Sequence, residues 1–230
     1  MNAGFVALIA LAVIHLFANQ AQILGWVWHG RFLSFAAGLS FAYVFVDLLP
    51  ELDKGQPILK QAFDPIVPYL DKHAYLIALA GVLFFYGIHT QSKDKSARGF
   101  WISTSGYLLF NFLVGASLSD PSDPDIQPLM LYTIAIGMHY FVRDHQATIE
   151  NNGIYDKEGR WMLVGALLVG YFFGYFTHIP ESIVAILVSF VAGGVLLNVL
   201  RYELPKREQV GYLFFVIGAV FYTTLILNLG

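Results

Sequence analysis

The chain has 230 residues, of which 57% are hydrophobic and only 13% are charged, with a mean hydropathy of +0.62 and a net charge of −3. A soluble domain carries about 25% charged residues, so this composition excludes a water-soluble fold and indicates an integral membrane protein. The lack of cysteine excludes a disulfide and a thiolate metal site, and no nucleic-acid partner is expected.

Hydropathy and helix-breaking residues predict an all-α membrane bundle of eight spans in a single transmembrane domain, 1–230. In chain order the spans cover 3–19, 32–49, 74–90, 100–118, 128–142, 161–176, 183–200 and 210–227. Several are near the lower length limit for crossing a bilayer, about 17–25 residues. Segment 23–28 is expected to be an interfacial turn with two tryptophan anchors. The three prolines within 56–70 predict an interfacial segment there rather than a regular span.

Part of the first quarter of the chain returns near its end. The segment SFAAG at 34–38 matches SFVAG at 189–193, and each glycine is followed twelve residues later by the proline of a Leu-Pro pair. The match continues in the next apolar run, where Tyr75, Leu76, Gly81 and Phe84 correspond to Tyr212, Leu213, Gly218 and Phe221. The copies are five spans apart and therefore cross the membrane in opposite directions. This predicts a 3+2+3 inverted repeat, with helices 1–3 at 3–90, helices 4–5 at 100–142 and helices 6–8 at 161–227.

The basic residues predict the orientation. Ten of the 13 lysines and arginines fall in loops one, three, five and seven, which should therefore be cytoplasmic. Both termini are then expected on the non-cytoplasmic side of a plasma or inner membrane. The outer loops are acidic, and this surface would either concentrate cations or be simply solvated.

Polar residues in the central helices are the candidate site, because inverted repeats place substrate sites near the midplane at the repeat interface. Asn111 lies near the middle of span four, and His139 lies about one turn from the cytoplasmic end of span five. Imidazole nitrogen and amide oxygen can bind zinc and similar metals. His15 in span one is a further candidate ligand. Interhelical hydrogen bonding is the alternative for all three residues.

Four residues near the ends of spans are candidate entry and exit sites for a cation. Asp47 lies at the outer end of span two and Glu203 at the inner end of span seven. Asn198 would extend the polar path near the cytoplasmic end. Glu181 follows a proline at the start of span seven, which suits either helix capping or capture of an external cation.

The stretch from Phe35 to Glu51, which includes Asp47-Leu48-Leu49-Pro50-Glu51, resembles the second helix of the ZIP zinc and iron transporters. Its copy at 192–205 carries the same resemblance, as do the eight spans, the outward termini and the 3+2+3 order. This resemblance implies a transporter of divalent metal cations, with ligands in helices four and five. Of the family's ligands the chain keeps Asn111 and His139. The other ligand positions are occupied by Phe110, Val114, Tyr140 and Arg143.

Three functions are compared on this basis. The first is a divalent cation transporter of the zinc or iron class, with a reduced metal site formed by Asn111, His139 and His15, and no enzymatic activity. The second is a non-transporting ZIP-like subunit or scaffold of a larger complex, where a histidine could hold a pigment or haem. The third is an intramembrane metal-dependent hydrolase, for which no nucleophile motif is found. Expected partners are the lipid bilayer, divalent cations such as Zn or Fe, and a homodimer or complex subunits. Gly170-x-x-x-Gly174 suits either a homodimer face or close packing between helices of one chain.

Overall fold

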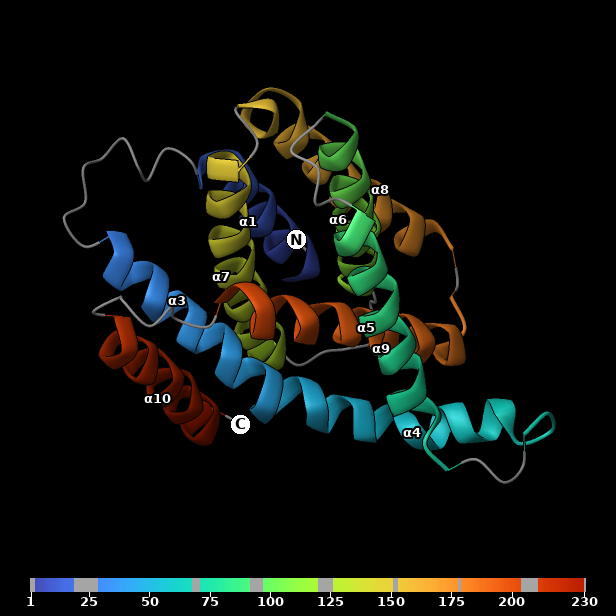
Figure 1. Ribbon diagram of the computed structural model, residues 1–230. Helices are drawn as coiled ribbons and strands as arrows, with labels where there is room; N and C mark the ends of the chain where they lie inside the picture. Colours follow the sequence, from blue (N-terminus) through green and yellow to red (C-terminus); the bar gives the residue numbers. More distant parts are fainter. Residues whose placement is uncertain are drawn as a thin grey trace.

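The computed structural model describes residues 3–18, 29–67, 71–91, 97–119, 126–150, 153–177, 179–203 and 211–229. Within these ranges every regular element is helical, and the helices pack into one bundle (Figure 1). The prediction of an all-α helical bundle is confirmed.

The described helices form eight rods, some of which contain a π-helical turn, written η. The rods are α1 (Ala3–Phe17); α3 (His29–Tyr43) with η1 (Val44–Leu48) and α4 (Leu49–Phe63); α5 (His73–Gln91); α6 (Ala97–Ser117); α7 (Ile126–Glu150); η2 (Tyr155–Gly159) with α8 (Arg160–Phe176); α9 (Glu181–Asn198) with η3 (Val199–Glu203); and α10 (Gly211–Leu229).

The distribution of apolar residues is that of a membrane protein. Five of the described helical segments are long and apolar enough to cross a bilayer: Gly30–Phe63, His73–Thr90, Tyr155–Phe176, Glu181–Arg201 and Gly211–Asn228. Their outward faces carry large apolar side chains, as on α10, where Tyr212, Leu213 and Leu227 are exposed. The interior instead holds histidine, asparagine and aspartate side chains. An apolar exterior around a polar interior is stable in lipid and not in water.

Two segments differ from the sequence-based prediction. Residues 56–63 continue α4 as regular helix with Pro57 inside it, so the prolines do not end the rod there. Helix α7 continues to Glu150, eight residues beyond the predicted end of span five, because the charged residues of its last turns lie against other helices. The predicted turn at 23–28 lies outside the described residues.

Two of the π turns occupy equivalent places in the repeated sequence. η1 precedes Pro50, and η3 precedes Pro205 by the same spacing. Proline has no N–H to donate, and its ring clashes with the carbonyl four residues earlier. A π turn widens the helix at that point and relieves the clash. The Leu-Pro pairs noticed in the sequence therefore mark two similar helix distortions.

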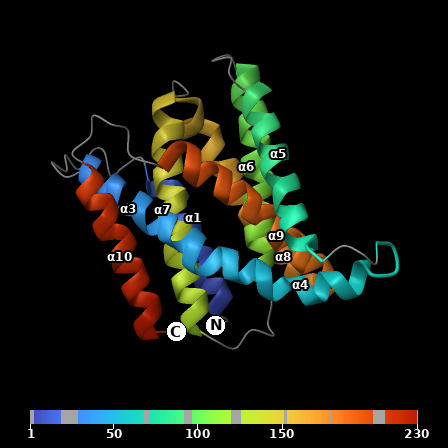
Figure 2. The same cartoon turned by 60° about the horizontal axis from the view of Figure 1, so that its bottom comes forward.

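Glycines bring the backbones of two helix pairs into direct contact. Helix α3 lies along α10, and α5 lies along α9 (Figure 2). A Cβ built on Gly38 would lie 1.9 Å from the carbonyl oxygen of Phe215, and one on Gly218 would lie 2.0 Å from that of Phe35. The α5–α9 pair shows the same mutual contact. A Cβ built on Gly193 would lie 1.9 Å from the carbonyl oxygen of Ala78, and one on Gly81 would lie 2.1 Å from that of Phe190. Only glycine permits such close approach.

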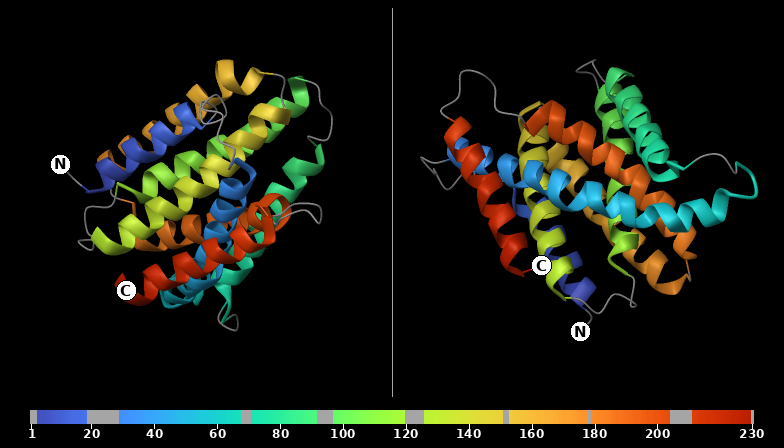
Figure 3. Two further views of the ribbon diagram at one scale, coloured as in Figure 1. Left: turned by 90° about the vertical axis from the view of Figure 1, so that its left-hand side faces the viewer. Right: turned by 90° about the horizontal axis from the view of Figure 1, so that it is seen from below.

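The two central helices, α6 and α7, pack against their neighbours in different ways: α6 through backbone and α7 through side chains. α6 contacts α8 through a third reciprocal pair, in which Gly115 faces the Leu167 carbonyl and Gly170 faces that of Phe112. α7 contacts α1 through side chains, since a Cβ on Gly137 would meet the side chain of Ile14. The two chain ends lie toward the same end of the bundle (Figure 3).

Candidate functional site

Three buried polar side chains from three helices converge around His15. His15 of α1 places Nδ1 2.7 Å from Oδ2 of Asp144 on α7, and Nε2 2.7 Å from Oδ1 of Asn111 on α6. The exposed fractions are 2% for His15, 1% for Asn111 and 1% for Asp144. The Tyr140 ring lies beside the imidazole, with centroids 4.1 Å apart. A buried carboxylate at this depth requires such partners, because an unpaired charge would be strongly destabilised.

The hydrogen bonds determine how many protons this cluster holds. The Asn111 Nδ2 group donates to the Tyr107 carbonyl at 2.8 Å, which directs Oδ1 toward His15. Oδ1 can only accept, so Nε2 of His15 must donate. At Nδ1, either the ring donates to an ionised Asp144 or a protonated Asp144 donates to the ring. Both arrangements contain the same number of protons, and both leave the His15–Asp144 pair with no net charge.

A second buried polar cluster is formed by Tyr107, His89 and Asn198. Tyr107 lies on α6 one turn before Asn111. The Tyr107 hydroxyl donates to Oδ1 of Asn198 on α9 at 3.1 Å and lies 3.4 Å from Nε2 of His89 on α5. His89 Nε2 is also 3.4 Å from Oδ1 of Asn198. Tyr107 therefore links the two clusters, because its hydroxyl belongs to one and its carbonyl oxygen orients Asn111 in the other.

A third polar contact joins the rod formed by α3, η1 and α4 to α10. The hydroxyl of Tyr222, which is fully buried, donates to Oδ2 of Asp47 in η1 at 2.6 Å. Two more tyrosines surround this contact, with the Tyr43 ring 6.2 Å from Tyr222 and 6.3 Å from Tyr132. Asp47 is half-buried, which places the predicted outer entry site beside an aromatic cluster rather than in open solvent.

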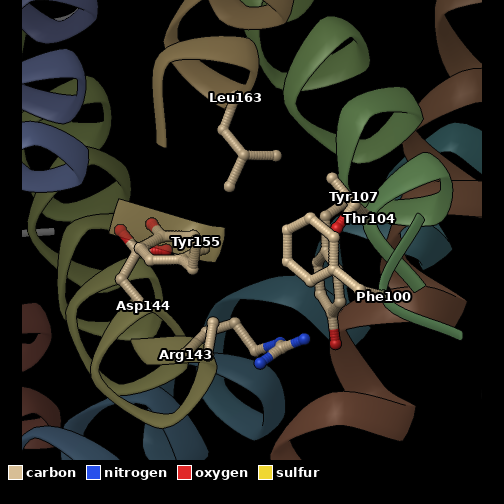
Figure 4. A pocket seen from close by; sticks show the side chains of 8 residues that line it. Phe100, Thr104, Tyr107, Arg143, Asp144, Tyr155 and Leu163 are labelled. Carbon is tan, nitrogen blue, oxygen red and sulfur yellow. The ribbon is translucent and has the colours of Figure 1, made fainter. Parts of the chain in front are cut away.

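A cavity adjoins Asp144. It is lined by Phe100, Thr104, Tyr107, Arg143, Asp144, Ala147, Tyr155 and Leu163 (Figure 4), and its empty volume of about 310 Å³ includes space open to solvent. The room left between side chains suffices for about one water molecule. The Arg143 guanidinium extends across the cavity and stacks on the Tyr107 ring, 4.0 Å from its centroid. Arg143 follows the predicted end of span five, but α7 continues past it, and its side chain reaches into the bundle.

The remaining predicted residues lie apart from His15. His139 is buried on α7 and packs near the rings of Phe110 and Tyr140, with centroids at 5.8 and 6.4 Å. Glu181 is exposed in the first turn of α9, where a carboxylate suits the positive helix end. Glu203 is the last residue of η3, and its side chain is not among those described. Across the described ranges, no group of three or more histidine, cysteine, aspartate or glutamate side chains could hold a metal ion.

Asp144 and Tyr107 are the site residues that sequence reasoning missed. Asp144 follows the predicted end of span five and was assigned to a loop. Its spacing of four residues from Tyr140 would have placed both on one face of a longer helix. Tyr107 precedes Asn111 by the same spacing, but tyrosine is too frequent in membrane helices for that spacing to stand out.

The fold and the buried clusters define a polytopic helical membrane protein with a polar site between its central helices and α1. Comparison of the chain with protein-family models, with curated proteins and with solved structures gives no match.

Proposed function

We propose that the chain is a ZIP-like membrane transport protein for a divalent metal cation, and that His15 and Asp144 are ligands of its cation site, with Asn111 orienting the His15 ring through Nε2. The observation that carries the proposal is the convergence of a carboxylate, an imidazole and an amide oxygen from three helices in the interior of the bundle. Ionisable residues buried inside a membrane helix bundle are costly and generally functional. Metals of the zinc and iron class accept this mixture of nitrogen and oxygen ligands.

This ligand set supplies the negative charge that the sequence-based set lacked. Asn111 and His139 alone are neutral and cannot offset a divalent charge. Asp144 provides a carboxylate, and it already touches an imidazole. Asp144 takes the place of His139 on α7, while His15 and Asn111 remain, so the proposed site keeps the same three helices and gains a carboxylate.

The metal would have to open the site slightly. Metal–ligand bonds of about 2.0–2.2 Å at the tetrahedral angle place two ligand atoms roughly 3.3–3.6 Å apart. His15 Nδ1 and Asp144 Oδ2 are 2.7 Å apart, so these two atoms, and with them α1 and α7, must separate by somewhat less than about 1 Å. Their interface is made of side chains, whereas the three glycine-linked pairs touch through backbone. The α1–α7 interface is therefore the one best suited to opening.

The proposal includes the 3+2+3 inverted repeat. In such a repeat helix two corresponds to helix seven and helix three to helix eight, so the α3–α10 contact corresponds to the α9–α5 contact. The four glycine contacts obey this correspondence: Gly38 against Phe215 becomes Gly193 against Ala78, and Gly218 against Phe35 becomes Gly81 against Phe190. The paired π turns and the position of both chain ends at one end of the bundle support the same arrangement, with both termini outside the cytoplasm.

Binding of Zn²⁺ and Mn²⁺ to the purified protein, followed by uptake into proteoliposomes, tests the site. Asp144→Asn and His15→Gln should each lower affinity at least tenfold and reduce uptake. His139→Gln is the matched control, because it removes a buried imidazole from α7 outside the proposed cluster. A loss of binding in His139→Gln, with His15→Gln unchanged, would return the site to the family's helix 4–5 position. Unchanged binding and uptake in Asp144→Asn and His15→Gln would refute the transport site.

One observation favours the second function, a non-transporting subunit or scaffold. Arg143 places a permanent positive charge in the cavity beside Asp144, where a divalent cation would be repelled. In a scaffold, the His15–Asp144–Asn111 cluster would serve only to hold three helices together. Absence of metal binding in the wild-type protein, with a partner protein that copurifies at fixed stoichiometry, would support this function.

A further inference from the structure

The cavity beside Asp144 lies at the end of the bundle where α6 and α8 begin. Phe100 is in the first turn of α6, Tyr155 is the first residue of η2, and Leu163 is in the first turn of α8. Asp144 thus contacts His15 on one side and lines this cavity on the other. By the basic-residue distribution, this end is the cytoplasmic one. The cavity is therefore a route between that end of the bundle and the proposed cation site.

Arg143 occupies this route in a defined position. Its guanidinium stacks on the Tyr107 ring, and that ring is fixed because its hydroxyl contacts Asn198 and His89. A guanidinium over an aromatic face is a stable arrangement for a buried arginine. The space left in the cavity suits about one water molecule, too little for a hydrated divalent cation.

We infer that Arg143 is a tethered cation that closes the cytoplasmic-side route to the His15–Asp144–Asn111 site and determines when a substrate cation can pass. The inference rests on the proposed function. The closed state has the guanidinium seated on Tyr107, and a cation passes only when the guanidinium leaves the cavity. Movement of Arg143 away from Tyr107 would also affect the cation site. The carbonyl oxygen of Tyr107 accepts the hydrogen bond that orients the Asn111 amide toward His15.

Thiol labelling measures closure of the route without any metal. The chain has no cysteine, so Thr104→Cys introduces a single thiol on the cavity wall against a clean background. The probe is the cationic reagent 2-aminoethyl methanethiosulfonate, applied to the purified protein in detergent. Labelling should be slow with Arg143 present and at least tenfold faster in Thr104→Cys with Arg143→Gln. Arg143→Lys keeps the charge and should remain slow.

The matched control is Arg160→Gln, which removes a positive charge from the same end of the bundle but not from the cavity lining. Labelling should be as slow in this variant as in the parent. Ala147→Cys places the thiol on α7 and serves as a second reporter if Thr104→Cys does not fold. Equal labelling rates with Arg143 and with Arg143→Gln, on either reporter, would overturn the inference.

Zn²⁺ binding by the cysteine-free variants separates this inference from the proposed function. Arg143→Gln should bind Zn²⁺ roughly tenfold or more tightly than the wild type, because a like charge beside the site is removed. Binding that depends on Asp144 but is unaffected by Arg143→Gln, together with unchanged labelling, overturns the tethered-cation role and leaves the transport site standing. Faster labelling without Zn²⁺ binding in any variant supports closure by Arg143 and refutes the transport site.

Discussion

Replacing Gly81 by alanine should destabilise the bundle, whereas the same change at Gly87 should not. Both glycines lie in α5. A Cβ on Gly81 would lie 2.1 Å from the carbonyl oxygen of Phe190 in α9, and a Cβ on Gly87 would meet nothing within 4 Å. The two substitutions change helix propensity equally, so the difference between them isolates the α5–α9 contact.

The magnitude follows from that distance. An ordinary contact begins at 3.4 Å, so Gly81→Ala forces the two helices apart by more than an ångström or bends one of them. Overpacking of this kind costs about 1–3 kcal/mol. Alanine in a helix gains up to about 1 kcal/mol over glycine, which is the full effect expected at Gly87. For a chain of this length, 1 kcal/mol shifts the melting temperature by about 2–4 °C.

Thermal unfolding in detergent, followed by far-ultraviolet circular dichroism, measures the difference. We expect the melting temperature of Gly81→Ala to lie roughly 2–12 °C below that of Gly87→Ala, and that of Gly87→Ala to stay or rise slightly relative to the wild type. Gly218→Ala, which faces the Phe35 carbonyl in the other pair, should behave like Gly81→Ala. Equal melting temperatures for Gly81→Ala and Gly87→Ala would refute the backbone contact between α5 and α9.

Three further outcomes are expected. Asp144→Asn leaves His15 without its anionic partner and should lower the free energy of unfolding by about 3–5 kcal/mol, measured by thermal unfolding; a loss below 1 kcal/mol would contradict a buried pair. Tyr222→Phe removes the 2.6 Å bond to Asp47 and should lower it by about 1.5–3 kcal/mol, without such a loss in Tyr212→Phe, whose ring is exposed. The hydrogen bond and charge of Lys60 lower the pKa of Asp71, so their contribution to stability is present at neutral pH and is lost as pH falls through that lowered pKa. Lys60→Gln should raise the pKa of Asp71 toward the ordinary value of an aspartate, which carbon NMR can measure.

The sequence predicted the helical class well because hydropathy and glycine spacing act locally. Gly38, Gly81, Gly193 and Gly218 stood out as a repeated pattern, and each faces a backbone carbonyl of a partner helix. Which helices would pair could not be read from that pattern. Pairing depends on how the rods cross, and a glycine specifies a close approach without naming its partner.

The polar site was predicted in part. His15 and Asn111 were predicted as site residues, and they share a hydrogen bond; His139, predicted as a polar residue of a central span, packs among aromatic rings instead. Asp144 was missed for a physical reason. Hydropathy falls at Arg143 and Asp144 because each carries a charge, and a window cannot register that His15 and the Tyr107 ring stabilise those charges inside the bundle. Helix ends set by long-range pairing are not encoded locally.

The π turn of η1 also rotates the helix that follows it. A π turn uses about one extra residue per turn, so the buried stripe beyond it is displaced by about 100° relative to a continuous α-helix. In a regular α-helix, the residue two turns after buried Tyr43 would be Pro50, seven residues on, but Pro50 is exposed. The buried positions nearest to Pro50 are Leu48 and Leu52. A helical wheel drawn through the whole rod would thus assign lipid-facing and protein-facing residues of α4 incorrectly, and cross-linking pairs between α4 and α9 must be chosen from a wheel restarted after Leu48.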